Sequence, residues 1–223
     1  MQHTKEFTHD WFSQNIENWQ RWLGDFQNRP DICALEIGSF EGRSTTWLLE
    51  NVLTHETSSI DCIDLFTDDY YHRFRCNVAP WANRVRAHRG PSFSVLPTLT
   101  GEFDIVYVDG DHIPFAVLSD AVLAWPRLKV GGLMIFDDYL FLPLELNPIN
   151  ALGKPWSPEL ALKQIAKHPG DSPKTAIDGF LASMIGNYEI VDKGYQVAIR
   201  KVAFSPIADP PPTKWPTGWG SAA

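Results

Sequence analysis

The sequence predicts an α/β fold: one doubly wound, mostly parallel sheet of seven strands with helices on both faces and a C-terminal antiparallel hairpin. Two observations carry this prediction. Short runs rich in Ile, Val and Leu alternate with helix-compatible stretches through residue 138, as in right-handed β-α-β crossovers. Runs so rich in these residues are typical of strands covered on both faces.

The elements are predicted in the following order. Residues 12–26 place Ile16, Trp19, Trp22 and Leu23 at helical spacing, so an amphipathic helix is expected there. Long strands are expected at the apolar runs 32–38, 58–66, 103–110 and 131–139, with a short strand at 84–88. Helices are expected between them at 44–53, 69–82, 94–99 and 114–125, the last with a proline at its first position.

Beyond Asp138 the pattern becomes irregular, with four prolines in sixteen residues, and predicts a long loop with one short helix at 158–167. A loop of this length is usually functional, so residues 139–172 are interpreted as an acceptor or lid loop. A helix at 175–185 and a hairpin turning at Asp192-Lys193-Gly194 follow.

The expected organisation is a single domain over 1–204, with an N-terminal helical segment at 1–30 and a tail at 205–223. The tail holds five of the seventeen prolines and is expected to be extended or disordered.

Charge and cysteine content restrict the function classes. Nineteen basic against twenty-seven acidic residues give a net charge of −8, which disfavours nucleic acid and anionic membranes as partners. The first thirty residues lack the apolar core of a signal peptide, and no stretch approaches the ~18 apolar residues of a membrane span. Cys33, Cys62 and Cys76 lack metal-ligand spacing, so we expect reduced thiols in a cytoplasmic protein.

A glycine turn follows the first predicted strand, in the run Glu36-Ile37-Gly38-Ser39-Phe40-Glu41-Gly42-Arg43-Ser44. Its glycines allow a sharp turn and a close approach to a ligand, and the next helix offers free N–H groups. The spacing matches neither a dinucleotide fingerprint nor a P-loop, which disfavours NAD and ATP. A plain strand-to-helix turn stays open for the glycines alone.

Asp64 ends the second predicted strand, where a carboxylate can accept both hydroxyls of a ribose. Capping of the next helix is the alternative role for this residue.

Four carboxylates follow two further strands: Asp109 and Asp111 after one, and Asp137 and Asp138 after the other. The interval 137 − 109 = 28 fits one crossover. If the two strands are adjacent, their axes lie ~4.8 Å apart and these side chains can converge on a common point. Carboxylates so close cannot all be ionised without a cation, and an oxygen-only cluster suits Mg²⁺, with Ca²⁺ or Mn²⁺ as alternatives. The competing interpretation is that Asp137 and Asp138 cap a loop.

The runs LEIGSFEGRST, IDLF, FDIVYVDGDH and LKVGGLMIFDDY resemble the class I S-adenosylmethionine-dependent methyltransferases. Within these the chain is most similar to the metal-dependent small-molecule O-methyltransferases that include the macrocin and catechol enzymes. The resemblance covers residues 32–138, with a continuation to 202. It implies a Rossmann-like fold and Mg²⁺-dependent O-methylation of a hydroxylated small molecule such as a secondary metabolite, phenol or sugar.

The resemblance also assigns residues. Those expected to bind S-adenosylmethionine are Glu36, Gly38, Ser39, Phe40, Gly42 and Ser44 around its methionine part, Asp64 at the ribose, Ser92 at the adenine, and Asp109. The expected metal ligands are Asp109, Asp137 and Asp138. The base that takes the acceptor proton is Asp111 by similarity to the macrocin side or His112 by similarity to the catechol side. His112 has the better unperturbed pKa, but it also precedes a helix entry, so Asp111 is placed slightly ahead.

Alternatives in other classes stay open. The same fold supports a metal-independent methyltransferase or a hydroxylase-like enzyme, and a non-catalytic cofactor-binding subunit is suggested by Trp215 and Trp219 in the tail. The expected partner is a small-molecule acceptor, with a wall formed by Phe141, Leu142, Leu144 and Trp156. The sequence leaves open whether oxygen or nitrogen is methylated and whether the chain forms a homo-oligomer.

Overall fold

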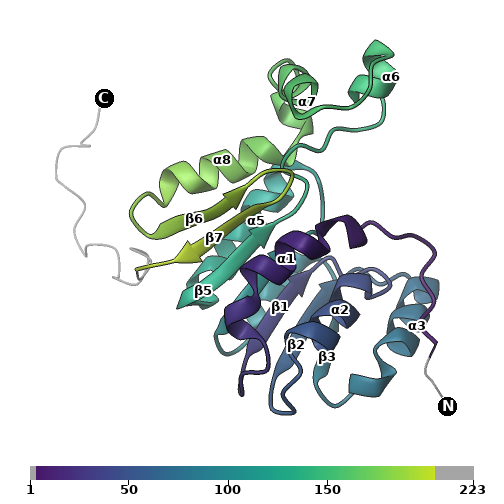
Figure 1. Cartoon of the computed structure of the whole chain (residues 1–223), viewed down its shortest axis with the longest axis vertical. Helices are drawn as coiled ribbons and strands as arrows, with labels where there is room; N and C mark the ends of the chain where they lie inside the picture. The colour runs from purple at the N-terminus through teal and green to yellow at the C-terminus, as the bar shows by residue number, and fades with distance from the viewer. Residues whose placement is uncertain (1–3, 204–223) are drawn as a thin grey trace, which may run out of the picture.

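A computed structural model of the chain describes residues 4–203, and its centre is one seven-stranded sheet in the order β3-β2-β1-β4-β5-β7-β6 (Figure 1). Strands β1 to β5 are parallel, while β7 is antiparallel to both β5 and β6. The predicted strand number, the parallel core and the C-terminal hairpin are confirmed. The strands are β1 Cys33–Ile37, β2 Ser59–Asp64, β3 Val85–Arg89, β4 Phe103–Val108, β5 Leu128–Phe136, β6 Tyr188–Lys193 and β7 Val197–Lys201.

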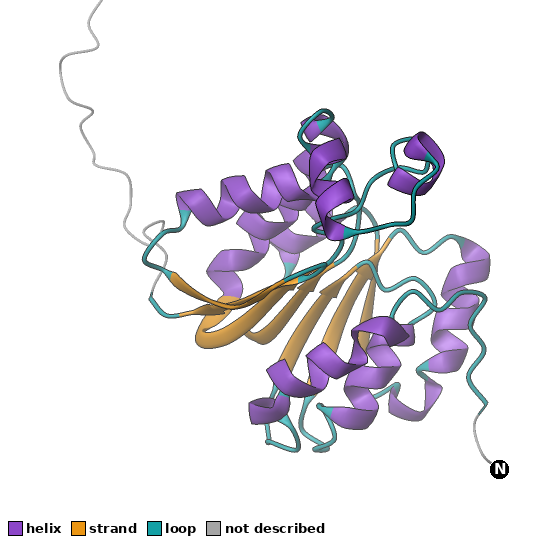
Figure 2. Ribbon diagram, turned by 45° about the horizontal axis from the view of Figure 1, so that its top comes forward, coloured by secondary structure: helices purple, strands orange, loops and turns teal. Residues whose placement is uncertain are grey.

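Helices cover both faces of this sheet (Figure 2). One face carries α1 Ile16–Trp22, α2 Arg43–Asn51 and α3 Asp68–Asn77; the other carries α4 Ser92–Val95, α5 Pro114–Ala124 and α8 Pro173–Ser183. Two short helices, α6 Pro148–Leu152 and α7 Pro158–Ile165, lie beyond the sheet edge at which the parallel strands end.

Each face has its own apolar core because successive strand residues point to opposite sides. In β1, Leu35 and Ile37 pack into the core beneath α5 and α8, whereas Ala34 packs beneath α1 and α2. The fully buried Trp19 of α1 belongs to the second core. The N-terminal segment is thus an integral part of the sheet's packing.

Several predicted boundaries were wrong. The helix expected over 12–26 is divided into a 3₁₀ turn, the seven-residue α1 and a second 3₁₀ turn that begins at Gly24. The loop expected to hold one helix contains two, because Asn147 caps α6 and Ser157 caps α7. The hairpin turns later than expected, since β6 runs to Lys193 and Gly194 donates to the Gln196 carbonyl. The tail at 205–223 lies outside the described residues.

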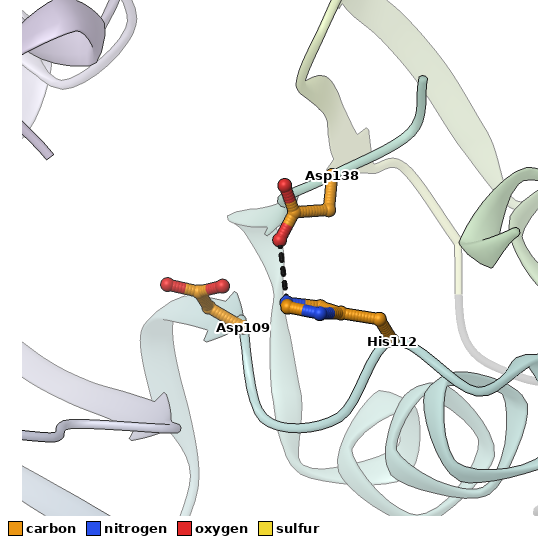
Figure 3. A group of neighbouring side chains, drawn as sticks. All are labelled: Asp109, His112 and Asp138. Carbon is orange, nitrogen blue, oxygen red and sulfur yellow. Dashed lines mark ion pairs between the residues drawn. The ribbon is translucent and has the colours of Figure 1, made fainter. Parts of the chain in front are cut away.

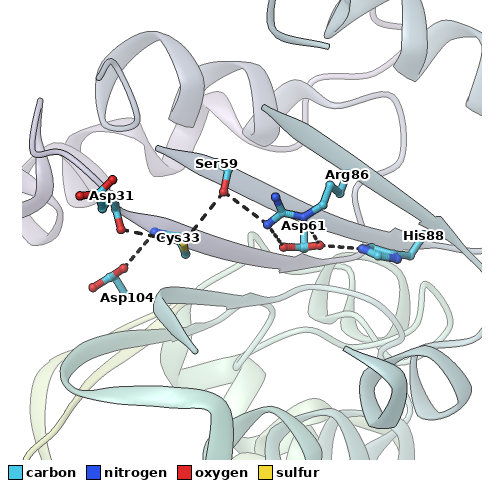
Figure 4. Close-up of polar contacts among 7 residues, drawn as sticks. All are labelled: Asp31, Cys33, Ser59, Asp61, Arg86, His88 and Asp104. Carbon is cyan, nitrogen blue, oxygen red and sulfur yellow. Dashed lines mark hydrogen bonds and ion pairs between the residues drawn. The ribbon is translucent and has the colours of Figure 1, made fainter. Parts of the chain in front are cut away.

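Strands β2 and β3 carry a polar network on one face (Figure 4). Asp61, 5% exposed, accepts hydrogen bonds from Arg86 and contacts His88 Nε2 at 2.7 Å. The Cys33 amide donates to Asp104 at 2.9 Å, and all three cysteines are free thiols, as predicted. This network satisfies the polar side chains of that face within the sheet itself.

Within residues 4–203, none of the helices combines the length and apolar character needed to cross a bilayer.

Candidate active site

Four residues of the predicted site form one row across the C-terminal edge of the sheet. Ile37 pairs with Ile63 and Val108, and Val108 pairs with Phe136. One residue further along each strand, the same registers place Gly38 beside Asp64 and Asp109, and Asp109 beside Asp137. The strand pairing, rather than the loops, therefore aligns the ribose candidate with the carboxylates.

The glycine turn fits tightly into this row. Gly38 has φ +89°, and a Cβ atom there would lie 1.8 Å from the Asp109 carbonyl oxygen. Phe40 also has a positive φ, +45°, and its amide donates to Asp64 Oδ2 at 2.8 Å. Asp64 Oδ1 accepts from the Phe66 amide at 2.7 Å. Asp64 is thus held in place by backbone donors on both sides.

Three residues expected around the methionine part lie beneath the turn. The Glu36 carboxylate is fully buried and accepts from the hydroxyls of Ser44, at 2.6 Å, and Thr45. Burial raises the pKa of this carboxyl, and the hydroxyl donors oppose the rise. Ser39 is also buried, and its hydroxyl has no hydrogen-bond partner among residues 4–203. The side chains of Glu36 and Ser44 therefore anchor the start of α2 to β1.

A cavity of about 550 Å³ opens in front of this row. It is lined from the ends of β1, β2, β3 and β4 and from the first turns of α5. Its lining includes the predicted residues Gly38, Asp64, Ser92, Asp111 and His112. Phe40 and Gly42 are outside this lining, and the Phe40 ring instead packs between those of Trp11 and Tyr70. The cavity thus collects the ribose, adenine and base candidates, but not the whole glycine turn.

Beside the cavity, Tyr107 links two of the carboxylates. Its hydroxyl contacts Asp109 Oδ2 at 2.8 Å and also Asp137 Oδ2. A phenol carries one proton, so it donates to one carboxylate at a time, and the second contact requires a proton on the acid. Burial and the neighbouring Asp137 raise the pKa of Asp109 well above its ordinary value, and burial with Asp138 raises that of Asp137 to about 6. Burial and mutual repulsion therefore make these two carboxyl groups bind protons more readily than separate, exposed carboxylates would.

Asp137 has donors on both carboxylate oxygens. Oδ2 accepts from Gln196 Nε2 at 2.9 Å and from Asn15 Nδ2 at 3.4 Å, and Oδ1 accepts from the Asp138 amide at 2.7 Å. Gln196 in turn accepts from Trp19 Nε1 at 2.9 Å. Two distant segments, the N-terminal helix and the final hairpin, thus hold this side chain in place.

Asp138 faces His112 on the other side of the site (Figure 3). His112 Nε2 lies 2.8 Å from Asp138 Oδ2, and the Tyr195 hydroxyl donates to Asp138 Oδ1 at 2.7 Å. Asp138 has φ +58°, an uncommon conformation for a residue other than glycine. The hydrogen bond to Asp138 raises the pKa of His112, and desolvation opposes the rise.

Asp111, the other base candidate, is exposed and accepts a hydrogen bond from the Ile113 amide at 3.1 Å, at the entry to α5. Of the two candidates, His112 is the one whose side chain joins the carboxylate cluster.

The residues expected to line the acceptor loop are divided between two environments. Leu142 is buried in the core, whereas Leu144 is 74% exposed. The Phe141 ring lies 4.2 Å from the His112 ring, centre to centre, and Trp156 packs 6.1 Å from Tyr195. Phe141 therefore lies next to His112, while Trp156 lies beside Tyr195, whose hydroxyl contacts Asp138.

Comparisons with known proteins agree with this geometry. A family described as "Methyltransferase domain" matches residues 35–139. Over this stretch, somewhat less than half of its length, the chain is similar to methyltransferase domains. It is 31% identical over 125 residues to O-methyltransferase hkm8 of Aspergillus hancockii, covering 54% of this chain and 48% of that protein. The chain thus spans about half the length of this curated relative.

Solved structures share the fold of this chain. MycE methyltransferase of the mycinamycin pathway, in complex with Mg and SAH, has a TM-score of 0.59 at 18% identity, over 91% of this chain and 53% of that one. O-methyltransferase TomG of Streptomyces achromogenes, in complex with SAM, has a TM-score of 0.54 at 19% identity, over 77% and 73%. These similarities establish the fold.

The donor set of the carboxylate cluster fits a divalent cation. Asp109, His112 and Asp138 each offer one ligand atom, and these three atoms lie within 4.8 Å of one another. The predicted set contained Asp137 in place of His112. Asp137 adjoins the cluster and, like Asp138, has hydrogen-bond partners on both of its carboxylate oxygens.

Sequence patterns missed four residues that support this site: Tyr107, Asn15, Gln196 and Tyr195. Tyr107 lies within an apolar strand run, and nothing in that run distinguishes it from a core residue. Asn15, Gln196 and Tyr195 reach the carboxylates from segments more than fifty residues away, and no local spacing marks them.

Proposed function

We propose that the protein transfers the methyl group of S-adenosylmethionine to a hydroxyl oxygen of a small acceptor molecule, with a divalent cation at the carboxylate cluster. One observation carries the proposal. His112 lines the 550 Å³ cavity and also belongs to the Asp109–His112–Asp138 cluster. A cofactor in the cavity and an acceptor at the cluster would therefore meet at this residue.

Charge supports the cofactor assignment. The cofactor carries a positive sulfonium, and Asp64, Asp109 and Asp138 are carboxylates at one edge of the sheet. Fixed negative charge lowers the energy of a cation in a partly buried site. Methyl transfer needs the attacking oxygen about 3 Å from the methyl carbon and in line with the breaking carbon–sulfur bond, so positioning supplies much of the rate.

His112 is the base in this proposal. With Nε2–H directed at Asp138, the free Nδ1 atom accepts the proton of the acceptor hydroxyl while the oxygen attacks the methyl carbon. The carbon–sulfur electrons go to sulfur, which gives neutral S-adenosylhomocysteine, and the resulting imidazolium is stabilised by the Asp138 carboxylate. Asp138 also fixes the ring orientation, assisted by the Phe141 ring on its other side.

Asp109 and Asp138 are the residues that would hold the cation, because the proton transfer uses both nitrogen atoms of His112. Their carboxylate oxygens suit Mg²⁺ or Mn²⁺. When bound, the cation supplies Lewis-acid binding of acceptor hydroxyl oxygens and lowers their pKa.

A metal-independent version of the same transfer is the second candidate. It is favoured by the hydrogen bonds that engage both oxygens of Asp138, one with His112 and one with Tyr195. A His–Asp pair of this kind accepts a proton without a metal, as in other histidine bases held by a carboxylate.

The acceptor class is proposed from the side chains beside the pair. Phe141 packs on His112, Tyr195 contacts Asp138, and Trp156 packs beside Tyr195. These aromatic rings suit a flat, hydroxylated molecule such as a phenol.

The test is methyl transfer from cofactor carrying a labelled methyl group to a panel of phenols, sugars and hydroxylated polyketides. Each acceptor is assayed with EDTA, Mg²⁺ or Mn²⁺. We expect labelled O-methyl product from a phenol, abolished by EDTA. EDTA-resistant product supports the metal-independent version, and no labelled product from any acceptor class contradicts O-methylation.

A further inference from the structure

Asp120, on α5, is a buried carboxylate that the reaction described above does not use. Its side chain is 1% exposed, and Oδ1 has no hydrogen-bond partner among residues 4–203. The same residue lines the 550 Å³ cavity. The unpartnered oxygen therefore belongs to a side chain at the wall of the cofactor cavity.

Leaving such an oxygen without a donor is costly. A buried polar atom that lacks a hydrogen bond loses its hydration without compensation, and native structures keep few of them. Burial raises the pKa of Asp120 to about 6, with the nearby Ser92 hydroxyl lowering it in part. A donor supplied by a ligand would remove this penalty.

The position of Asp120 in the cavity indicates which ligand group could reach it. Asp64, at the end of β2, is the ribose candidate, whereas Ser92, just after β3, contributes to the cavity wall beside Asp120. Gly110 packs closely against two neighbours. A Cβ atom there would lie 3.4 Å from Asp120 Oδ2 and 3.2 Å from the Ile37 side chain. A nucleoside whose ribose binds Asp64 would direct its base toward Ser92 and Asp120.

We propose that Asp120 accepts a hydrogen bond from the exocyclic amino group of the cofactor's adenine and so selects for that base. The amino group is a donor with two protons, and an ionised carboxylate only accepts, so the two groups are complementary. The inference rests on the proposed use of S-adenosylmethionine.

Selection against other purines follows from the same contact. An analogue that lacks the amino group leaves the Asp120 oxygen buried and unpaired, and sites built around a hydrogen bond reject analogues that cannot make it.

Calorimetric titration tests this with two probes: S-adenosylhomocysteine, and its analogue with hydrogen in place of the 6-amino group. The analogue keeps the ribose and the ring nitrogens. We expect wild type to prefer the amino compound by roughly 10- to 100-fold, as for a hydrogen bond to a charged group. Asp120→Ala should bind both compounds within about threefold, by losing affinity for the amino compound. Val122→Ala, a change of a 44% exposed side chain on the same helix outside the cavity lining, should keep the wild-type preference.

The outcomes separate this inference from the proposed function. If wild type binds neither compound, both are contradicted. If wild type binds both compounds equally, if Asp120→Ala keeps the full preference, or if it weakens both compounds alike, only the inference is overturned. Should Asp120→Ala not fold, wild type with S-adenosylhomocysteine labelled with ¹⁵N at the amino group gives the answer. A downfield, slowly exchanging amino proton is expected on binding, and a free-ligand shift overturns the inference.

Discussion

The Nε2 atom of His112 lies 2.8 Å from Oδ2 of Asp138, on a residue whose backbone has the left-handed φ of +58°. The strained backbone turns the Asp138 side chain away from Asp137, its neighbour in sequence, and toward the histidine. Consecutive aspartates thus have different partners: Asp137 is held by Tyr107 and Gln196, and Asp138 by His112 and Tyr195. Of these four partner residues, only His112 titrates near neutral pH.

The first prediction concerns the pH profile of methyl transfer. The base must be neutral, and Asp138 raises the pKa of His112, so kcat/KM should rise with pH through a midpoint above the ordinary histidine value of ~6.5. His112→Gln should lower kcat/KM by roughly 10²- to 10⁴-fold and remove this limb. His72→Gln, at an exposed histidine of α3, is the control and should keep the wild-type profile. If kcat/KM of His112→Gln still rises with pH as in wild type, another group accepts the proton of the acceptor.

The second prediction concerns cation binding, measured on Mn²⁺ by calorimetry without cofactor or acceptor. Burial and neighbouring carboxylates raise the pKa of Asp109, so protons compete with the cation. Affinity should therefore increase from pH 5 to pH 7, and binding should release protons, seen as a heat that depends on the buffer. Asp109→Asn should abolish binding, whereas Asp171→Asn, at an exposed aspartate, should not. Binding that is equally tight in Asp109→Asn would contradict the cation site.

The third prediction concerns the contact between Gly38 and Asp109. Gly38→Ala should destabilise the protein for two reasons, a positive φ and a collision with the Asp109 carbonyl. Gly131→Ala is a matched control, because Gly131 has φ +84° but a Cβ atom there would have nothing within 4 Å. The collision should make Gly38→Ala worse by about 1–3 kcal/mol in urea denaturation. Equal losses in the two variants would mean that the turn relaxes away from β4.

The fourth prediction concerns stability against pH in the absence of cofactor. The folded-state pKa of Asp120, about 6, lies above its value in the unfolded chain, so the folded state retains its proton longer. Its contribution is present below about pH 4 and is lost as pH rises to about 6, by up to about 3 kcal/mol. The unfolding free energy of Asp120→Asn minus that of wild type should therefore increase from pH 4.5 to pH 7. A constant difference would mean that Asp120 ionises normally in the folded protein.

The fold was predictable from sequence where burial on both faces leaves a simple signature. The runs around Ile37, Ile63 and Val108 are apolar because helices cover both sides of the central strands. Short helices gave no such signal: α6 has five residues, fewer than two turns, and depends on the Asn147 cap. The first helix ends earlier than predicted because Gly24 begins a 3₁₀ turn, although the apolar spacing continues past Trp22.

The part of the candidate site that could be predicted from the sequence consists of carboxylates at the ends of strands. Asp64, Asp109 and Asp137 are recognisable because each follows a buried strand. The partners that determine their protonation and orientation were not recognisable, because Tyr107 has the pattern of a core residue and Gln196 reaches Asp137 from 59 positions away. Asp120 likewise lies on an ordinary helical face, and only the tertiary structure places its oxygen at a cavity.

The registers in which β1, β2, β4 and β5 pair determine the alignment of Gly38, Asp64, Asp109 and Asp137. Loops between the strands can therefore change length without moving these four residues, whereas His112 and Asp138 lie in such loops and depend on their length. A single residue inserted within β4, by contrast, would reverse the faces of the residues that follow it and carry Asp109 about 3.3 Å out of line. Substitutions confined to this row could redirect the chemistry while the hydrophobic packing below stays as it is.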